Sequence, residues 1–415
     1  MRVDTQDARD LEAVAYLRTP EAVRKRCEQI FAAGVDGRLA HFRIDLTRLP
    51  HVAERIVTVT RQSYPLLDIP PHSRMGHFNA GGVDRLRTTL PPAPDDPDEY
   101  ARRLIDLTVT SVLLDAGAGE AWRYRDTATN TVLSRSEGLA VASLNIFAQG
   151  MFSADANDPC RADASRLAQL NEDELGAGFQ VSSSNPLVGL SGRTTLLRRL
   201  GEVVATTPEY FGVDRPRVGG LLDHFRQRAK ENRILATDVL ATVLTSLGPI
   251  WPGRLTLAGV NLGDVGRHPA AAGEGASTGL VPFHKLSQWL TYSLFAPLAT
   301  AGMTIVGSDG LTGLAEYRNG GLFVDLGVLS PRQPAVYDEA HAPYSEIIVE
   351  WRALTVALLD RVANLIRSQL KLSASDLSLA QVLEGGTWRA GREVAAERRS
   401  DARPPIRVAS DGTVF

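Results

Sequence analysis

The stretch Ile347-Ile-Val-Glu-Trp-Arg-Ala-Leu-Thr-Val-Ala-Leu-Leu-Asp-Arg-Val-Ala-Asn-Leu-Ile366 decides the fold class of this chain. Its large apolar side chains return at intervals of three and four residues, and they are Ile347, Trp351, Leu354, Leu358, Val362 and Leu365. Such spacing places these side chains on one face of an α-helix. The sequence therefore predicts a long helix over residues 347–366 that packs against an apolar core.

Helical spacing recurs along most of the chain. It covers residues 1–65, 99–114, 137–152, 237–247 and 282–298. Residues 249–279 are instead rich in glycine and proline, so we expect a long connection there. Because strands are sparse and no internal repeat is visible, the predicted fold class is mainly α, a large helical domain with few short strands.

The composition narrows the class of protein. The chain has 415 residues, of which 44% are hydrophobic, so it can bury a large core as one domain or as two closely packed ones. Its 45 basic and 48 acidic residues give a net charge of −3. A nucleic-acid-binding protein would need a basic patch, so we expect no nucleic-acid partner.

The ends and the cysteines point to a soluble cytoplasmic protein. Cys27 and Cys160 are too few for a disulfide framework or a zinc cluster. The N-terminal residues are polar and lack the apolar core of a signal peptide. No apolar run approaches the roughly 18 residues that a membrane span needs. At the other end, residues 404–415 predict a hairpin-like segment docked on the helical body, with Phe415 buried.

Polar residues gather in the segment Leu311-Thr-Gly-Leu-Ala-Glu-Tyr-Arg318. Glu316, Tyr317 and Arg318 place a carboxylate, a phenol and a guanidinium at consecutive positions. Together with Lys285, such a set could hold a phosphorylated sugar and act on its anomeric carbon. The alternative is a buried salt-bridge network, because such networks collect the same residue types.

Lys285 opens a second polar group. Gln288 follows it at +3 and Tyr292 follows Gln288 at +4, so the three residues share one helix face. A cation with neighbouring donors suits a phosphate or a sugar hydroxyl. The alternative is a solvated polar face, which is the usual place of a lysine.

Two further sets are weaker candidates. His72, Arg74 and His77 could clamp a phosphate, but without an acidic neighbour they make a poor metal site. Asp264 and His268 are four residues apart, and a metal pair there is a weak hypothesis. We therefore expect no metal and no cofactor.

Three of these segments resemble motifs of the queuosine 5′-phosphate N-glycosylases. Leu311-Thr-x-x-x-Glu-Tyr-Arg318 is similar to their Leu-Thr-x-x-x-Asp-Tyr-Arg, and Phe283 to Leu290 is similar to their Phe-x-Lys-Arg-x-Gln-x-Leu. Residues 350–356 resemble their Glu-x-Arg-Ala-x-Thr-Val. This resemblance rests on short motifs, so it is the more distant of two.

A closer resemblance, over nearly the whole chain, is to the uracil catabolism protein family of fungi and bacteria. The segments that carry it appear in order, and they are Ile69–Arg74 with His77-Phe78, Ser111–Gly119, Gln180–Arg193, Gly259–Asp264 and Ser410–Phe415. The family spans residues 1–415 as one unit. A division into an N-terminal helical part, 1–180, and a glycosylase-like part with the site, 181–415, is the alternative.

The resemblances imply a reaction and a fold. Glu316 takes the position of an aspartate that is taken to be catalytic in the queuosine 5′-phosphate N-glycosylases. Asp309 and Asp325 are low-ranked candidates for a second acid. The implied fold is similar to the helix-hairpin-helix fold of DNA glycosylases, with Gly259 to Gly263 as a candidate hairpin turn. The implied activity is hydrolysis of an N-glycosidic bond.

The leaving group is inferred from the base pocket. Asn185 and Arg193 lie in a segment similar to the one that lines the base pocket of the queuosine 5′-phosphate N-glycosylases. The aromatic residues of that segment are missing in this chain. A pocket without stacking aromatics suits a small leaving group such as urea. The leading hypothesis is a hydrolase that splits a ribosylurea phosphate, and Lys285, Gln288, Tyr292, Tyr317, Arg318, His77, Asn185 and Arg193 are its candidate substrate-binding residues.

Two other hypotheses remain. The protein could be a non-catalytic scaffold or regulator of uracil degradation, with a purely structural polar cluster. A phosphoribosyl transferase would need magnesium and an acidic diphosphate-binding motif that the sequence does not contain. The leaving group, the need for a 5′-phosphate and the oligomeric state stay open at this stage.

Overall fold

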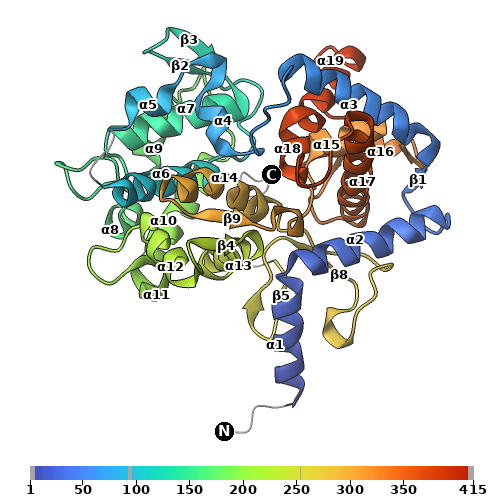
Figure 1. Cartoon of the computed structure of the whole chain (residues 1–415), viewed down its shortest axis with the longest axis horizontal. Helices are drawn as coiled ribbons and strands as arrows, with labels where there is room; N and C mark the ends of the chain where they lie inside the picture. The colour runs from blue at the N-terminus through green and yellow to red at the C-terminus, as the bar shows by residue number, and fades with distance from the viewer. Residues whose placement is uncertain (1–4, 92–95, 253, 410–415) are drawn as a thin grey trace. The chain divides into compact units, whose positions relative to one another are not determined.

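The computed structural model describes residues 5–91, 96–252 and 254–409 of the chain (Figure 1). The described part is mainly α-helical with short two-stranded sheets, which confirms the predicted fold class. The longer helices are α1 Thr5–Leu17, α2 Pro20–Val35, α3 Leu49–Ser63, α6 Pro97–Leu113, α7 Arg135–Ala148, α10 Leu190–Thr206, α13 Ala236–Ser246, α14 Lys285–Thr300, α17 Glu346–Leu370 and α19 Trp388–Arg398. None of the described helices is both long and apolar enough to cross a lipid bilayer.

Shorter helices connect the long ones. They are α4 Arg74–Phe78, α5 Arg85–Thr89, α8 Ala164–Ala168, α9 Glu172–Gly178, α11 Pro208–Phe211, α12 Leu221–Arg228, α15 Tyr317–Asp325, α16 Ala335–Asp338 and α18 Leu379–Val382. The 3₁₀ turns are η1 Leu46–Arg48, η2 Ala80–Gly82, η3 Val218–Gly220, η4 Gly248–Ile250, η5 Gly275–Ser277 and η6 Ser308–Gly310, and η7 Leu383–Thr387 is a π-helix.

The strands form six pairs. Antiparallel pairs join β1 Phe42–Ile44 to β10 Leu329–Pro331, β2 Tyr124–Asp126 to β3 Thr131–Leu133, β5 Thr256–Leu257 to β6 Val260–Asn261, and β7 Val265–Arg267 to β8 Leu280–Pro282. Parallel pairs join β4 Arg233–Leu235 to β9 Thr304–Val306 and β11 Ala340–His341 to β12 Arg407–Val408.

The chain folds into two compact units, each assembled from separate segments. Unit 1 consists of residues 5–72, 254–288 and 307–409, and unit 2 of residues 73–91, 96–252 and 289–306. The first four residues of α14 belong to unit 1 and the rest of that helix to unit 2. No boundary of either unit falls at residue 180.

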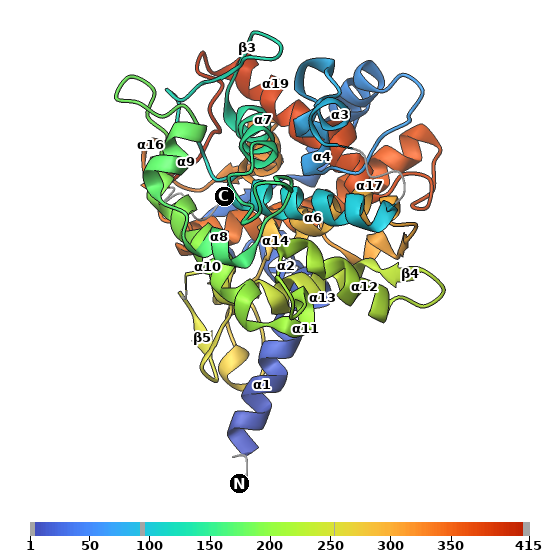
Figure 2. The same cartoon turned by 90° about the vertical axis from the view of Figure 1, so that its left-hand side faces the viewer.

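Unit 1 is built around α17, the helix predicted from residues 347–366. Every residue from Ile347 to Leu359 is buried, so this half of the helix is enclosed on all sides. It packs against α2, α3 and α15 (Figures 1 and 2). The start of α2 is fixed by Thr19, whose side chain accepts the Ala22 N–H at 3.1 Å, and by Pro20 in the first turn. The helical periodicity therefore predicted the centre of unit 1 correctly.

Unit 2 is also helical. Its α10 packs on α8 and α9, while α6 packs on α7 and η3. Every residue of α6 from Leu104 to Leu113 is buried, so this part of the helix is enclosed on all sides. Its strands β2 and β3 form an antiparallel pair.

The glycine-rich connection departs from one expectation. Residues 256–261 form the antiparallel pair of β5 and β6, and Gly259 turns the chain between them with a φ of 73°. The hypothesis that Gly259 to Gly263 form the turn of a helix-hairpin-helix is therefore wrong. The physical reason is local, because a glycine in the left-handed region between two short strands suits a β-hairpin.

The end of the described chain docks on unit 1. Ile406 is 1% exposed, and β12 pairs in parallel with β11. Of the hairpin expected over residues 404–415, residues 410–415, Phe415 among them, lie outside the described part of the chain.

Candidate functional site

Glu316 is the N-cap residue of α15. Its carboxylate accepts the backbone N–H of Arg318 at 2.8 Å and that of Asn319 at 2.5 Å, one on each oxygen. These bonds satisfy two of the donors that a helix start leaves unpaired, and the helix dipole favours the negative charge there. Glu316 is only 9% exposed. The structure therefore has a buried carboxylate, held by two backbone N–H groups, at the position that the sequence predicts to be catalytic.

The surroundings tune the acidity of this carboxyl group. Burial raises the pKa of Glu316 above its usual value, and this is the largest effect. The two backbone N–H groups and the charges of Lys285 and Arg318 lower the pKa, but they offset the burial only in part. A carboxyl group with a raised pKa can exchange a proton closer to neutral pH, which suits general acid–base chemistry.

Lys285 is the first residue of α14 and is half-buried. Its positive charge acts on Glu316, so the structure brings these two predicted site residues into electrostatic reach within unit 1. Its backbone N–H donates to Asp264 Oδ2 at 3.0 Å. The helix start is thus fixed by a side chain from the preceding connection.

Gln288 braces the same region. Its Nε2 donates to Thr312 Oγ1 at 2.7 Å and to the Phe283 carbonyl at 3.0 Å, while its Oε1 accepts the Thr312 N–H at 2.9 Å. Gln288 is 0% exposed and Tyr292 is 1% exposed. The alternative of a solvated polar face is therefore wrong for both residues. The buried Gln288 side chain joins α14 to the segment at Thr312.

Tyr317 and Arg318 flank the carboxylate on the chain. Arg318 is buried, and its Nη1 donates to the Ala402 carbonyl at 2.7 Å. Its guanidinium carbon lies 5.4 Å from the centre of the Tyr317 ring, a cation–π distance. Tyr317 itself is 38% exposed. The phenol is thus the most accessible group of the Glu316–Tyr317–Arg318 run.

His77, Asn185 and Arg193 lie in unit 2. The His77 ring packs 5.7 Å from the Trp289 ring, and its Nδ1 is 3.4 Å from Nη1 of the buried Arg74. Asn185 accepts the Arg123 N–H at 2.8 Å and donates to the Arg123 carbonyl at 2.9 Å. These contacts place His77 beside an aromatic ring and join the Asn185 side chain to the backbone of Arg123.

Arg193 is held by backbone carbonyls. Its guanidinium donates to the carbonyls of Leu114 at 3.0 Å and Gly117 at 3.1 Å, and also to those of Ala116 and Val188. Burial lowers the pKa of Arg193 to about 10. These four carbonyls account for the burial of the arginine, and its role in ligand binding stays a prediction.

Several weaker candidates turn out to be ion-paired. His72 Nδ1 lies 2.7 Å from Glu384 Oε2 in unit 1, so His72 faces a carboxylate. Asp325 receives both Nη atoms of Arg399, at 2.8 and 2.6 Å. Asp309 Oδ1 lies 3.5 Å from Arg367 Nη2. Because each acid has a basic partner, neither aspartate gains support as a second acid.

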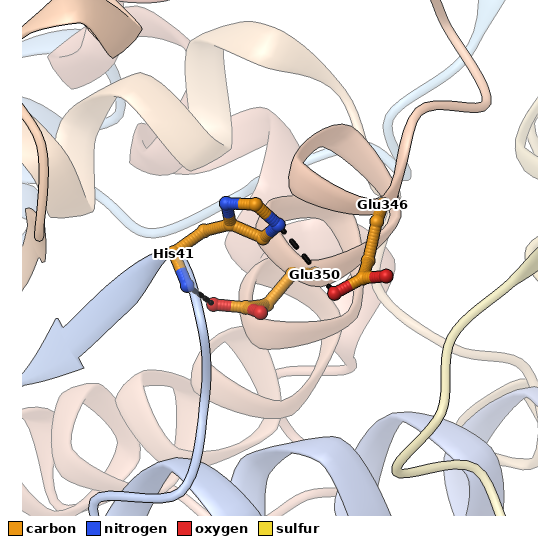
Figure 3. Close-up of side chains that lie close together, drawn as sticks. All are labelled: His41, Glu346 and Glu350. Carbon is orange, nitrogen blue, oxygen red and sulfur yellow. Dashed lines mark hydrogen bonds and ion pairs between the residues drawn. The ribbon is translucent and has the colours of Figure 1, made fainter.

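A group that the sequence did not suggest consists of His41, Glu346 and Glu350 (Figure 3). Their ligand atoms lie within 4.8 Å of one another, as a metal site would require, and His41 Nε2 is 3.5 Å from Glu346 Oε1. Glu350, however, is fully buried and its Oε1 accepts the backbone N–H groups of His41 at 3.1 Å and Phe42 at 2.8 Å. Glu350 Oε1 thus holds the start of β1 through these two hydrogen bonds.

The other oxygen of Glu350 faces His268. His268 Nε2 lies 3.2 Å from Glu350 Oε2, and His268 Nδ1 accepts the Ala270 N–H at 3.1 Å. Since Nδ1 accepts, the neutral ring carries its proton on Nε2 and donates it to the carboxylate. Three N–H donors therefore satisfy Glu350. Asp264, the suggested metal partner of His268, pairs instead with Arg352 at 2.9 and 2.8 Å.

The fold and the site together define a class, a mainly helical protein with a buried helix-capping carboxylate beside a lysine. The chain belongs to the family described as protein of unknown function (DUF1688), whose sequence profile matches residues 16–415. It is similar to Protein urg3 of Schizosaccharomyces pombe, with 41% identity over 414 residues that cover 97% of this chain and 99% of the relative. It is similar to Uracil catabolism protein 4 of Lachancea kluyveri, with 39% identity over 438 residues and the same coverage. The predicted family is confirmed.

Proposed function

We propose that this protein acts in uracil catabolism as a hydrolytic N-glycosidase, and that its substrate is a ribosylurea 5′-phosphate that yields urea and ribose phosphate. The pathway is inferred from the name of the relative Uracil catabolism protein 4. The reaction is inferred from one observation above all, the buried Glu316 carboxyl group with its raised pKa beside the charge of Lys285.

Glu316 would act at the anomeric carbon of the sugar, where the N-glycosidic bond is cleaved. Cleavage of an N-glycosidic bond develops positive charge on the sugar, and a preorganised carboxylate stabilises that charge. A carboxylate has about four acceptor positions, of which two receive N–H groups of α15. The remaining positions would orient the attacking water and take its proton. The fixed cap would keep the group in place during the reaction.

Lys285 and Arg318 would bind the anionic or hydroxyl groups of the sugar phosphate. Both charges act on Glu316, so a phosphate held by them would lie near the carboxylate. The exposed ring of Tyr317 would line the entrance. Gln288 would shape the site through its buried contact with Thr312. Tyr292, His77, Asn185 and Arg193 belong to unit 2, and their role in substrate binding stays a prediction.

The experiment measures urea released from ribosylurea with and without a 5′-phosphate by the purified protein. We expect release from the phosphorylated compound and its loss in the Glu316→Gln variant. Asp45→Asn is the matched control, because Asp45 is also a capping carboxylate of unit 1, on η1, but is half exposed. A folded wild-type protein that releases no urea from either compound would contradict the activity and favour a scaffold or regulatory role.

A further inference from the structure

We propose that Asp264 and Arg352 form a positioning pair that sets the placement of Lys285 relative to Glu316. The inference rests on the proposed function, because Lys285 and Glu316 are the groups assigned to substrate there. All four residues belong to unit 1. Asp264 and Arg352 would act through the backbone segments that they hold, so they are positioning residues.

Asp264 fixes the start of α14. Its carboxylate Oδ2 accepts the backbone N–H of Lys285 at 3.0 Å. Its main-chain carbonyl accepts the backbone N–H groups of Phe283 at 2.9 Å and His284 at 3.4 Å. Three consecutive N–H groups therefore end on one residue. Helix starts leave such donors unpaired, so Asp264 determines where the first turn of α14 begins.

His284 shows how strongly this start is constrained. It has a φ of 48°, in the left-handed region that disfavours side chains with a Cβ. It is 3% exposed, and its ring Nε2 lies 2.9 Å from the Leu17 carbonyl. Strained backbone persists only where the surroundings over-determine it, and it gathers at functional sites. The strained residue is the one directly before Lys285.

Arg352 connects this start to the catalytic segment. Its two Nη atoms grip both oxygens of Asp264, at 2.9 and 2.8 Å, and its Nε lies 3.4 Å from the Ala315 carbonyl. Ala315 directly precedes Glu316. The guanidinium also packs 4.0 Å over the Phe283 ring and is 5% exposed. The rigid, planar guanidinium of Arg352 thus contacts both the residue that holds the Lys285 N–H, Asp264, and the residue that precedes Glu316.

A second arginine of α17 offers a matched control. Arg361 grips both oxygens of Glu28, at 2.6 and 2.8 Å, and packs 3.7 Å over the Phe31 ring. It shares the helix, the forked ion pair and the cation–π contact with Arg352. Its partner Glu28 lies in α2, away from the chain segments of α14 and α15. Glu28→Gln therefore removes a forked pair of similar geometry, more exposed than that of Arg352, that holds different segments.

The experiment compares Asp264→Asn, Arg352→Lys and Glu28→Gln, with thermal melting of each variant to show that it is folded. We expect kcat/KM for urea release from the phosphorylated compound to fall by roughly 10- to 100-fold in the first two variants, because misplacement of about 1 Å has such effects. Arg352→Lys keeps the charge but loses the fork. If Asp264→Asn does not fold, Arg352→Lys alone tests the positioning pair. Glu28→Gln should retain its kcat/KM.

A second readout does not depend on activity. The ionisation of Glu316 is followed by ¹³C NMR of labelled glutamate carboxyl groups and assigned by the signal that Glu316→Gln lacks. Displacement of Lys285 should raise the Glu316 titration midpoint in Asp264→Asn and Arg352→Lys, but not in Glu28→Gln. An unchanged midpoint in folded variants would overturn the positioning role. If the wild type releases no urea, the activity is refuted while the titration still decides on the pair.

Discussion

At the scale of single residues, Glu316 combines two tasks. It caps α15 through two backbone N–H groups, which would by themselves favour the ionised form, and yet its pKa is raised because burial outweighs them. Aspartate and asparagine are the commoner caps, and glutamate reaches the same donors with one more methylene. A substitution here therefore changes both helix stability and chemistry, and the two effects need separate measurements.

Glu316→Gln should reduce kcat by about 10²- to 10³-fold, because it removes one electrostatic catalytic group and keeps its shape. The amide oxygen can still accept one N–H, so the loss of stability should be no more than about 1 kcal/mol. Urea release and thermal melting separate the two effects. Full activity in a folded variant would contradict the catalytic assignment.

The raised pKa of Glu316 also predicts a pH dependence of stability. Stability from the protonated carboxyl group is complete below the unfolded-state pKa of about 4.3 and is lost as pH rises through the folded-state pKa. The free energy of unfolding of the wild type, minus that of Glu316→Gln, should therefore decrease as pH rises above about 4. Urea denaturation at several pH values measures this difference. An increase with pH would show that the folded-state pKa is lowered.

Lys285→Ala should weaken binding of the phosphorylated substrate more than that of the dephosphorylated one. A charged hydrogen bond to phosphate stabilises a complex by about 2 kcal/mol, so KM for the phosphorylated compound should rise by roughly 30-fold. Steady-state kinetics with both compounds give the comparison. Equal losses for the two substrates would place Lys285 at the sugar or the leaving group.

At the scale of elements, the helices were largely predictable and the site was predictable only in part. The start of α2 follows from the local cap at Thr19 and Pro20, whereas α14 begins where Asp264, 21 positions before Lys285, accepts the Lys285 N–H. The pairing of Asp264 with Arg352 joins residues 88 positions apart, and no local pattern announces it. Glu350 and its partner His41 are separated even further along the chain. Long-range partners of buried charges depend on tertiary packing, so they appear only in the structure.

The contact between α15 and α17 gives a prediction for the elements themselves. A Cβ at Gly320 would lie 2.7 Å from Thr355 Oγ1 and 2.8 Å from Trp351 Cε2, so the two helices leave no room for a side chain. Gly320→Ala should lower the free energy of unfolding by about 1 to 3 kcal/mol, despite the higher helix propensity of alanine. Gly117→Ala is the control, because nothing lies within 4 Å of its added Cβ. Equal melting of both variants would contradict this tight approach.

At the scale of the whole molecule, the proposed chemistry uses groups of the chain itself. Hydrolysis through an oxocarbenium-like transition state needs no Lewis acid. Glu350, the buried member of the His41–Glu346–Glu350 group, already accepts three N–H donors. Dialysis against EDTA should therefore leave urea release unchanged. Activity that is lost on chelation and restored by a divalent ion, but not in His41→Ala, would assign a metal to that group.

The assembly of unit 1 from three separated segments has a consequence for synthesis on the ribosome. Arg24 of α2 pairs with Asp360 of α17 across 336 positions, so the first helices emerge long before the helix that covers them. Elongation proceeds at about 5 to 20 residues per second, and such distant contacts form slowly. The nascent chain thus carries an incomplete core, with Glu316 and Lys285 already made, until α17 leaves the exit tunnel. Unit 1, which holds Lys285 and Glu316, is therefore completed only after α17 and α19 have been made, and α2 and α3 lack these packing partners until then.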